Sequence, residues 1–128
     1  FLSGSRATLY FGMGEYDKAE KQALDKIRLL TPSAKENSTH RRAIGEAQIT
    51  LGSTYASQVI GAIEDENSPF PEKIYTKMEN SLNAAIAIFD EMEQAGLMSD
   101  VEKFQRGQAQ NMLKVMQEFR MSLPAGKQ

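Results

Sequence analysis

The chain has 128 residues, of which 41% are hydrophobic and 25% are charged, and it carries a formal net charge of −2. These values are typical of one ordinary soluble domain with a single core, and they exclude a nucleic-acid binder with a basic stripe. The sequence also lacks cysteine, which excludes disulfides and thiolate sites, and it has no apolar run long enough to span a membrane.

The sequence leaves the cellular compartment open. Because the chain begins at Phe1 rather than at a methionine, we expect a processed product or a fragment, from which a signal peptide, a lipid anchor or further repeats could have been lost. We expect a bacterial protein of either the cytoplasm or the periplasm, since the absence of cysteine does not separate the two.

The first two predicted helices flank a pair of glycines. One helix covers about Leu2 to Met13, and Gly12 and Gly14 break it. The next helix runs from about Tyr16 to Leu30, and Pro32 ends it because proline cannot continue the hydrogen-bond ladder. Its apolar residues recur three or four apart and predict one buried face, made of Tyr16, Ala19, Ala23, Ile27 and Leu30.

The third helix is predicted over about Thr39 to Glu64. Its start is uncertain by several residues. Ser33 with Glu36 could form a capping box, and further caps are offered by Asn37, Ser38 and Thr39. Its apolar stripe consists of Ile44, Ala47, Leu51, Tyr55, Val59 and Ala62.

The fourth helix follows a loop from Glu64 to Pro71 and runs to Ala95. Pro71 suits its first turn, and Gly96 suits its C-terminal cap. The segment from Ala84 to Phe89 is apolar on all sides, so we expect it at the centre of the core. The stripe of this helix consists of Ile74, Met78, Leu82, Ala85, Phe89 and Met92.

The fifth helix opens with a second capping box, Ser99 with Glu102, and Pro124 closes it. Its stripe consists of Val101, Phe104, Met112, Val115, Met116 and Phe119. Its methionine-rich end, with Met121 and Leu123, could dock a partner or a further repeat, but packing against the fourth helix is favoured. Five helices joined by short turns, without strand signals, predict an all-α fold of antiparallel helical hairpins.

The glycine pair allows two interpretations. A phosphate-cradling loop needs a strand that feeds it, so that backbone amides converge on the phosphate. Here a helix precedes Gly12 and Gly14, Asp17 stands where a third glycine would be, and no Gly-Lys-Ser/Thr follows. The pair is therefore predicted to be the turn of a helical hairpin, and no nucleotide or other cofactor is expected.

This first hairpin resembles a tetratricopeptide repeat (TPR), a helix–turn–helix unit of about 34 residues. The matching small, aromatic and proline positions are Ala7, Tyr10, Gly14, Tyr16, Ala19 and Pro32. A second copy begins at Leu51–Tyr55, which has the Leu-Gly-x-x-Tyr of the first helix of a repeat. The match is imperfect, because the copies are further apart than one repeat and Ala23 stands where a larger aromatic residue is usual.

The resemblance implies one domain over residues 1–128, a right-handed superhelix. Residues 1–32 would form the first hairpin, 39–95 an elongated second hairpin and 99–123 a C-terminal capping helix. The first and third helices would line a groove for a peptide, through Thr8, Phe11, Glu46, Ile49, Ser53, Ala56 and Ser57. Ile49 and Ser53 stand where lysine and asparagine clamp a C-terminal carboxylate in one subclass, so that clamp is not supported. Helix packing by Ser53, Ala56 and Ser57 is an equal alternative.

No set of residues predicts catalysis or metal binding. His40 is the only histidine, and we expect it in solvent near the start of the third helix. Glu64, Asp65 and Glu66 lack the alternating oxygen ligands of a calcium loop. An exposed face is predicted for Asp90, Glu91 and Glu93. Since no catalytic constellation can be assembled, an enzyme is not expected.

The sequence therefore predicts a non-catalytic scaffold that binds a protein or peptide in the groove of the first and third helices. Two alternatives remain open. One is a structural domain that forms homo-oligomers through its terminal helices. The other is a cavity for a small molecule or a lipid among the long helices.

Overall fold

The computed structural model describes residues 15–64, 67–124 and 126. Four α-helices lie in these ranges: α2 (Tyr16–Ala34), α3 (Ser38–Ile63), α4 (Glu72–Gln94) and α5 (Asp100–Ser122). No strand occurs in them, so the all-α class is confirmed. The predicted first helix, from Leu2 to Met13, lies outside the described residues together with the glycine pair.

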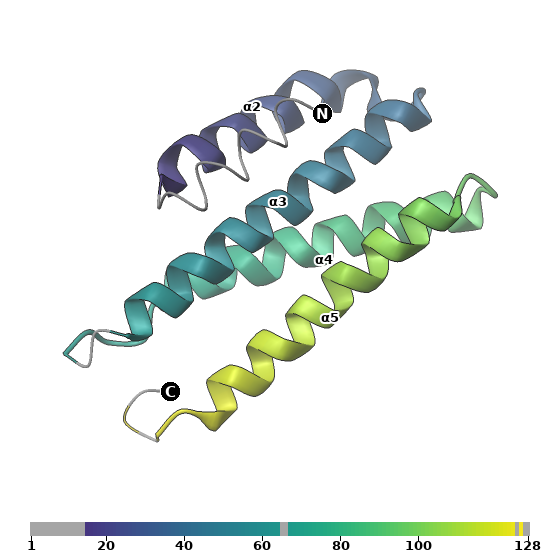
Figure 1. The fold of residues 1–128 in the computed structure, drawn as a ribbon. Coiled ribbons are helices and arrows are strands. Elements are labelled where there is room, and N and C mark those ends of the chain that lie inside the picture. The colour runs from purple at the N-terminus through teal and green to yellow at the C-terminus, as the bar shows by residue number, and fades with distance from the viewer. Residues whose placement is uncertain (1–14, 65–66, 125, 127–128) are drawn as a thin grey trace.

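The helices run in alternating directions, with α3 at the centre of the arrangement (Figure 1). α3 packs against both α2 and α4, while α5 packs on α4 and makes a smaller contact with α3. Consecutive helices are thus antiparallel neighbours. None of the four described helices combines the length and the hydropathy that a membrane crossing requires.

The end of α2 differs from the prediction. Pro32 lies inside the helix, which continues to Ala34 instead of stopping near Leu30. Proline is compatible with a helical φ, and its missing N–H leaves a single carbonyl without its usual partner. The same turn gains a side-chain hydrogen bond, since Thr31 Oγ1 donates to the carbonyl of Ile27 at 2.5 Å.

The start of α3 uses Asn37 and not the capping box of Ser33 and Glu36. The Asn37 side chain accepts a hydrogen bond from the backbone N–H of His40 at 3.2 Å, which is N-cap geometry. Ser33 instead belongs to α2, and its hydroxyl lies 2.5 Å from Nδ1 of His40. His40 is half-buried in this turn, at the start of α3 where the sequence predicts it.

The end of α4 has the predicted glycine cap. Gly96 has φ of +74°, which favours glycine. Its N–H donates to the carbonyl of Glu93 at 3.0 Å, and the N–H of Leu97 donates to the carbonyl of Met92 at 2.8 Å. These two bonds are those of a Schellman motif, which turns the chain sharply toward α5.

Two glycines let α3 and α4 approach closely. A Cβ atom on Gly45 would lie 2.9 Å from Cζ of Phe89, and one on Gly52 would lie 2.6 Å from Cγ of Leu82. Real Cβ contacts are essentially never so short. Gly52 of the Leu51–Tyr55 segment therefore lies at a helix–helix contact.

The core is formed mainly by the predicted stripes of α3 and α4. Within the apolar segment from Ala84 to Phe89, however, only Ala85 and Phe89 are buried, and Ala87 is exposed. The segment is therefore not central on all sides. α4 packs against both α3 and α5, and Ala87 lies on the part of its surface that these two helices leave exposed.

The predicted stripe of α5 is only partly buried. Met116 is buried, and Met112 and Phe119 pack against the core, in agreement with the prediction. Val101 and Phe104 are 61% and 68% exposed. These two residues face away from α3 and α4, so the apolar surface of α5 is wider than the surface that its neighbours cover.

Candidate functional site

A groove of about 430 Å³ lies between α2 and α4, across α3. Three helices contribute three residues each to its lining: Glu20, Leu24, Ile27, Gln48, Leu51, Tyr55, Lys77, Asn80 and Ser81. This volume is in the range of sites that hold small molecules or peptide side chains, roughly 300 to 1,000 Å³. We therefore take this groove, referred to below as the α2–α4 groove, as the candidate site.

Leu24 provides the exposed apolar surface of the α2–α4 groove, above a floor of core residues. Leu51 and Tyr55 are buried in the core, and Ile27 packs against that core. Leu24 is 46% exposed, although it is a large aliphatic side chain. A partner that covered Leu24 would remove apolar area from water, which is favourable by about 25 cal/mol per Å².

A hydrogen bond between two helices sets the polar edge of the groove. The Tyr55 hydroxyl of α3 donates to Oε2 of Glu20 on α2 at 2.6 Å. Burial raises the pKa of Tyr55, and the hydrogen bond to Glu20 and the negative charge of Glu20 raise it further. Tyr55 therefore stays neutral and acts as a donor that fixes the Glu20 carboxylate. On the opposite wall, Lys77 Nζ lies 5.8 Å from the centre of the Tyr55 ring.

Part of the predicted groove of the first and third helices is used for packing. Ala56 is buried in the core, and Ile49 packs against the core from the side. The Ser53 hydroxyl donates to Sδ of Met112 on α5 at 3.7 Å. This stripe of α3 is thus directed at α5 and the interior, as the helix-packing alternative predicts.

The other residues of that predicted groove are not brought together. Thr8 and Phe11 lie outside the described residues, so the first wall of the groove stays a prediction. Glu46 and Ser57 are half-buried on α3, more than two helical turns apart. The structure gives these two residues no common contact.

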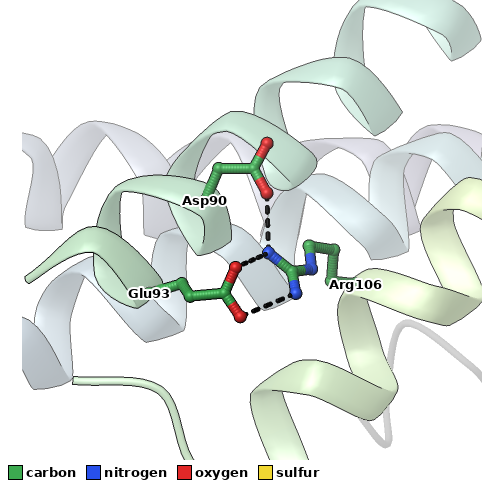
Figure 2. Close-up of polar contacts among 3 residues, drawn as sticks. All are labelled: Asp90, Glu93 and Arg106. Carbon is green, nitrogen blue, oxygen red and sulfur yellow. Dashed lines mark hydrogen bonds and ion pairs between the residues drawn. The ribbon is translucent and has the colours of Figure 1, made fainter. Parts of the chain in front are cut away.

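A charged cluster joins α4 to α5 (Figure 2). The guanidinium of Arg106 on α5 contacts Asp90 at 2.7 Å and both carboxylate oxygens of Glu93 at 3.1 Å. The hydrogen bonds and the charge of Arg106 lower the pKa of Glu93. Asp90 and Glu93 are exposed, as predicted, but they are ion-pair partners and do not form an unoccupied acidic site.

A buried carboxylate holds the start of α5 against α3. Glu102 is 1% exposed and forms the predicted capping box with Ser99. One carboxylate oxygen lies 3.0 Å from Nη2 of Arg42 at the start of α3. Burial alone would raise the pKa of Glu102, but the hydrogen bonds from Ser99 and the charge of Arg42 lower it overall. Glu102 is therefore an ionised structural group.

An arginine joins the other end of α5 to α4. Arg120 pairs with Glu72 in the first turn of α4. Its guanidinium lies 4.1 Å from the centre of the Phe70 ring and 4.9 Å from that of Tyr75. These contacts are cation–π geometry. α5 is thus fixed to α4 by Arg106 near its start and by Arg120 near its end.

Sequence reasoning did not find the α2–α4 groove, although one signal pointed to it. Tyr55 was predicted as a core residue of the α3 stripe. A buried tyrosine, unlike a phenylalanine, carries a hydroxyl that needs a hydrogen-bond partner. That requirement indicates a polar group next to the stripe, which the structure identifies as Glu20. Among the described residues, no group of three or more histidine, aspartate or glutamate side chains could hold a metal ion.

Comparisons with protein-family models, curated proteins and solved structures find no significant match to this chain.

Proposed function

We propose that this chain is a non-catalytic, TPR-type binding scaffold that holds a peptide segment of a protein partner. The α2–α4 groove is the observation that carries the proposal. It presents an exposed leucine, a fixed carboxylate and an amine from three different helices. Recognition sites combine apolar contact area with a few placed polar groups in this way. The antiparallel succession of helices around α3 supports the TPR-type architecture.

Two grooves are candidates for holding the peptide. The groove expected between the first and third helices would use Thr8, Phe11 and Glu46, but Ile49 and Ser53 on its α3 side are already in packing contacts. The α2–α4 groove, in contrast, has an exposed leucine, Leu24, among the described residues that line it. We therefore place the partner in the α2–α4 groove.

Selection of short random peptides displayed on phage tests this function. The intact chain is the target, and enriched peptides are synthesised and titrated by calorimetry. We expect one-to-one binding and a higher melting temperature, because a ligand that binds only the folded state stabilises it. Leu24→Glu is expected to abolish binding.

Leu29→Glu is the matched control, because Leu29 is a 69% exposed leucine of the same helix that does not line the groove. It is expected to bind the selected peptides like the parent. If no peptide is enriched, or if the two variants bind equally well, the groove is not the binding surface that we propose.

The exposed apolar residues of α5 favour a second candidate function, homo-oligomerisation. Val101, Phe104 and Val115 are 61%, 68% and 50% exposed on this terminal helix. Exposed apolar area of this kind can drive self-association. Sedimentation equilibrium over a range of concentrations separates the two functions, because an oligomer of this type would gain mass with concentration and Phe104→Glu would restore the monomer.

A further inference from the structure

The charge of Glu20 indicates what kind of peptide the α2–α4 groove accepts. Glu20 is half-buried in the wall of the groove, and the Tyr55 hydroxyl binds only its Oε2. No lysine or arginine of the described chain forms an ion pair with it, whereas cations do pair with Glu15, Asp25, Asp90 and Glu93. A half-buried carboxylate without a cation is less screened by water than an exposed one, so it attracts a positive charge more strongly.

The apolar part of the groove lies next to this carboxylate. Leu24 follows Glu20 by one helical turn, and residues four apart lie on the same face of a helix. Ile27 continues the same wall, and Leu51 of α3 lies beneath it. A ligand that reaches Glu20 with a positive group can therefore cover Leu24 with an apolar one.

No cation of the described opposite wall forms an ion pair with Glu20. Among the described residues that line the groove, Lys77 is the only cation, and its ammonium group lies over the Tyr55 ring, 5.8 Å from the ring centre. It is exposed, so water screens its charge. The other groups on the α4 wall, Asn80 and Ser81, are neutral donors and acceptors that can bind peptide amide groups.

From this arrangement we propose that the α2–α4 groove recognises a peptide segment in which a lysine or arginine stands beside a large aliphatic or aromatic residue. The basic group pairs with the Glu20 carboxylate that Tyr55 fixes, and the apolar side chain covers Leu24 and Ile27. This proposal rests on the proposed function and names the chemistry of its partner. Binding of this kind weakens as salt concentration rises, because one ion pair contributes to it.

Peptides selected on the intact chain test the proposal through Glu20→Gln. Glutamine keeps an oxygen that can accept the Tyr55 hydrogen bond but removes the charge. We expect the enriched peptides to contain lysine or arginine next to leucine, isoleucine or phenylalanine. We also expect Glu20→Gln to weaken their binding by about tenfold or more. Replacing the basic residue of a peptide with norleucine should weaken binding to the parent equally, and should have little further effect on Glu20→Gln.

Glu36→Gln is the charge control, since Glu36 is an exposed carboxylate in the turn between α2 and α3, away from the groove. It is expected to leave binding unchanged. Enriched peptides that lack basic residues, or that bind Glu20→Gln and the parent alike, would overturn the inference. If those peptides still lose binding in Leu24→Glu, the proposed function survives while the inferred chemistry fails. If no peptide is enriched, both fail.

Discussion

At Gly52 a single hydrogen atom in place of a side chain determines how closely α3 approaches α4. A Cβ there would overlap the side chain of Leu82, which is fully buried and has little room to move. Gly61 lies in the same helix, but no atom comes within 4 Å of the Cβ that it would gain. Comparing the same substitution at Gly52 and at Gly61 therefore separates the effect of packing on stability from the effect of helix propensity.

Gly52→Ala is expected to destabilise the protein by about 1 to 3 kcal/mol, because overpacking a close helix contact forces side chains or backbone to shift. Gly61→Ala should instead leave stability unchanged or raise it by up to about 1 kcal/mol, since alanine favours a helix more than glycine does. Urea denaturation followed by circular dichroism measures both. Equal stability of the two variants would mean that α3 and α4 do not meet at Gly52.

Substitutions on α2 test in the same way how closely this helix packs against the core at Ala19. It is fully buried at the small position of the repeat-like turn, so a larger side chain has no space. Ala19→Leu is expected to destabilise the protein by about 1 to 3 kcal/mol. Lys21→Leu, which places the same side chain at an exposed position of α2, should have a much smaller effect on the urea midpoint. Parent-like unfolding of Ala19→Leu would contradict the close contact of α2 with α3.

Glu102 makes the stability of the folded protein depend on pH in the acidic range. Its pKa is lowered in the folded state from an ordinary value of 4.5. The ionised Glu102 side chain therefore adds to the free energy of unfolding at pH values above 4.5. The contribution is lost as the pH falls through the lower, folded-state pKa. We expect Glu102→Gln to be less stable than the parent by about 1 to 3 kcal/mol at neutral pH, because it removes the negative charge that strengthens the hydrogen bonds from Ser99 and forms the ion pair with Arg42.

The difference in stability between Glu102→Gln and the parent should shrink steadily as the pH is lowered below 4.5. Glu102 of the parent then takes up a proton, first in the unfolded chain and at lower pH in the folded protein. Unfolding in urea at a series of pH values measures it, with the exposed Glu118→Gln as a control that should follow the parent. A difference that is independent of pH would show that the charge of Glu102 does not hold α5.

At the scale of helices, the sequence predicted most of what local interactions determine. The stripes of α3 and α4, the glycine cap of α4 and the capping box of α5 each depend on residues within a few positions of one another. The end of α2 differs from the prediction because a proline in the last turn disturbs only one hydrogen bond, so Pro32 does not end the helix.

The candidate site could not be predicted in the same way, because it depends on how separate helices lie against one another. Glu20, Tyr55 and Lys77 are on three helices, and only their packing brings them to one groove. Similarly, the exposure of Phe104 depends on which helices cover α5 and not on its place in an apolar stripe. A single sequence shows which face of a helix is apolar, but not how much of that face a neighbour covers.

The ion pairs between α4 and α5 are expected to orient α5 more than they stabilise it. Asp90 and Glu93 are exposed, so solvent screens their attraction to Arg106. Arg106→Gln should lower the melting temperature only slightly at low salt, and the difference should vanish when sodium chloride is raised. A large loss that persists in high salt would mean that Arg106 stabilises the structure through the packing of its aliphatic part instead.

In the whole molecule, α3 lies between α2 and α4 and contacts both. α3 carries the floor of the α2–α4 groove, and it also holds α5 through Arg42 and Ser53. A groove built on packed helices is largely formed before its ligand arrives, which reduces the loss of conformational entropy on binding. The melting temperature should therefore rise on binding while the helix content stays the same.

Nuclear magnetic resonance of the ¹⁵N-labelled chain locates the peptide, which we propose to bind across α2, α3 and α4. Backbone amide signals are followed while a selected peptide is titrated to saturation. We predict that the shifts concentrate at Leu24, Tyr55 and Lys77 and their neighbours in the groove, and that signals of exposed α5 residues such as Val101 and Phe104 stay in place. Shifts confined to α5, with line broadening that indicates a doubled mass, would contradict the claim and favour self-association.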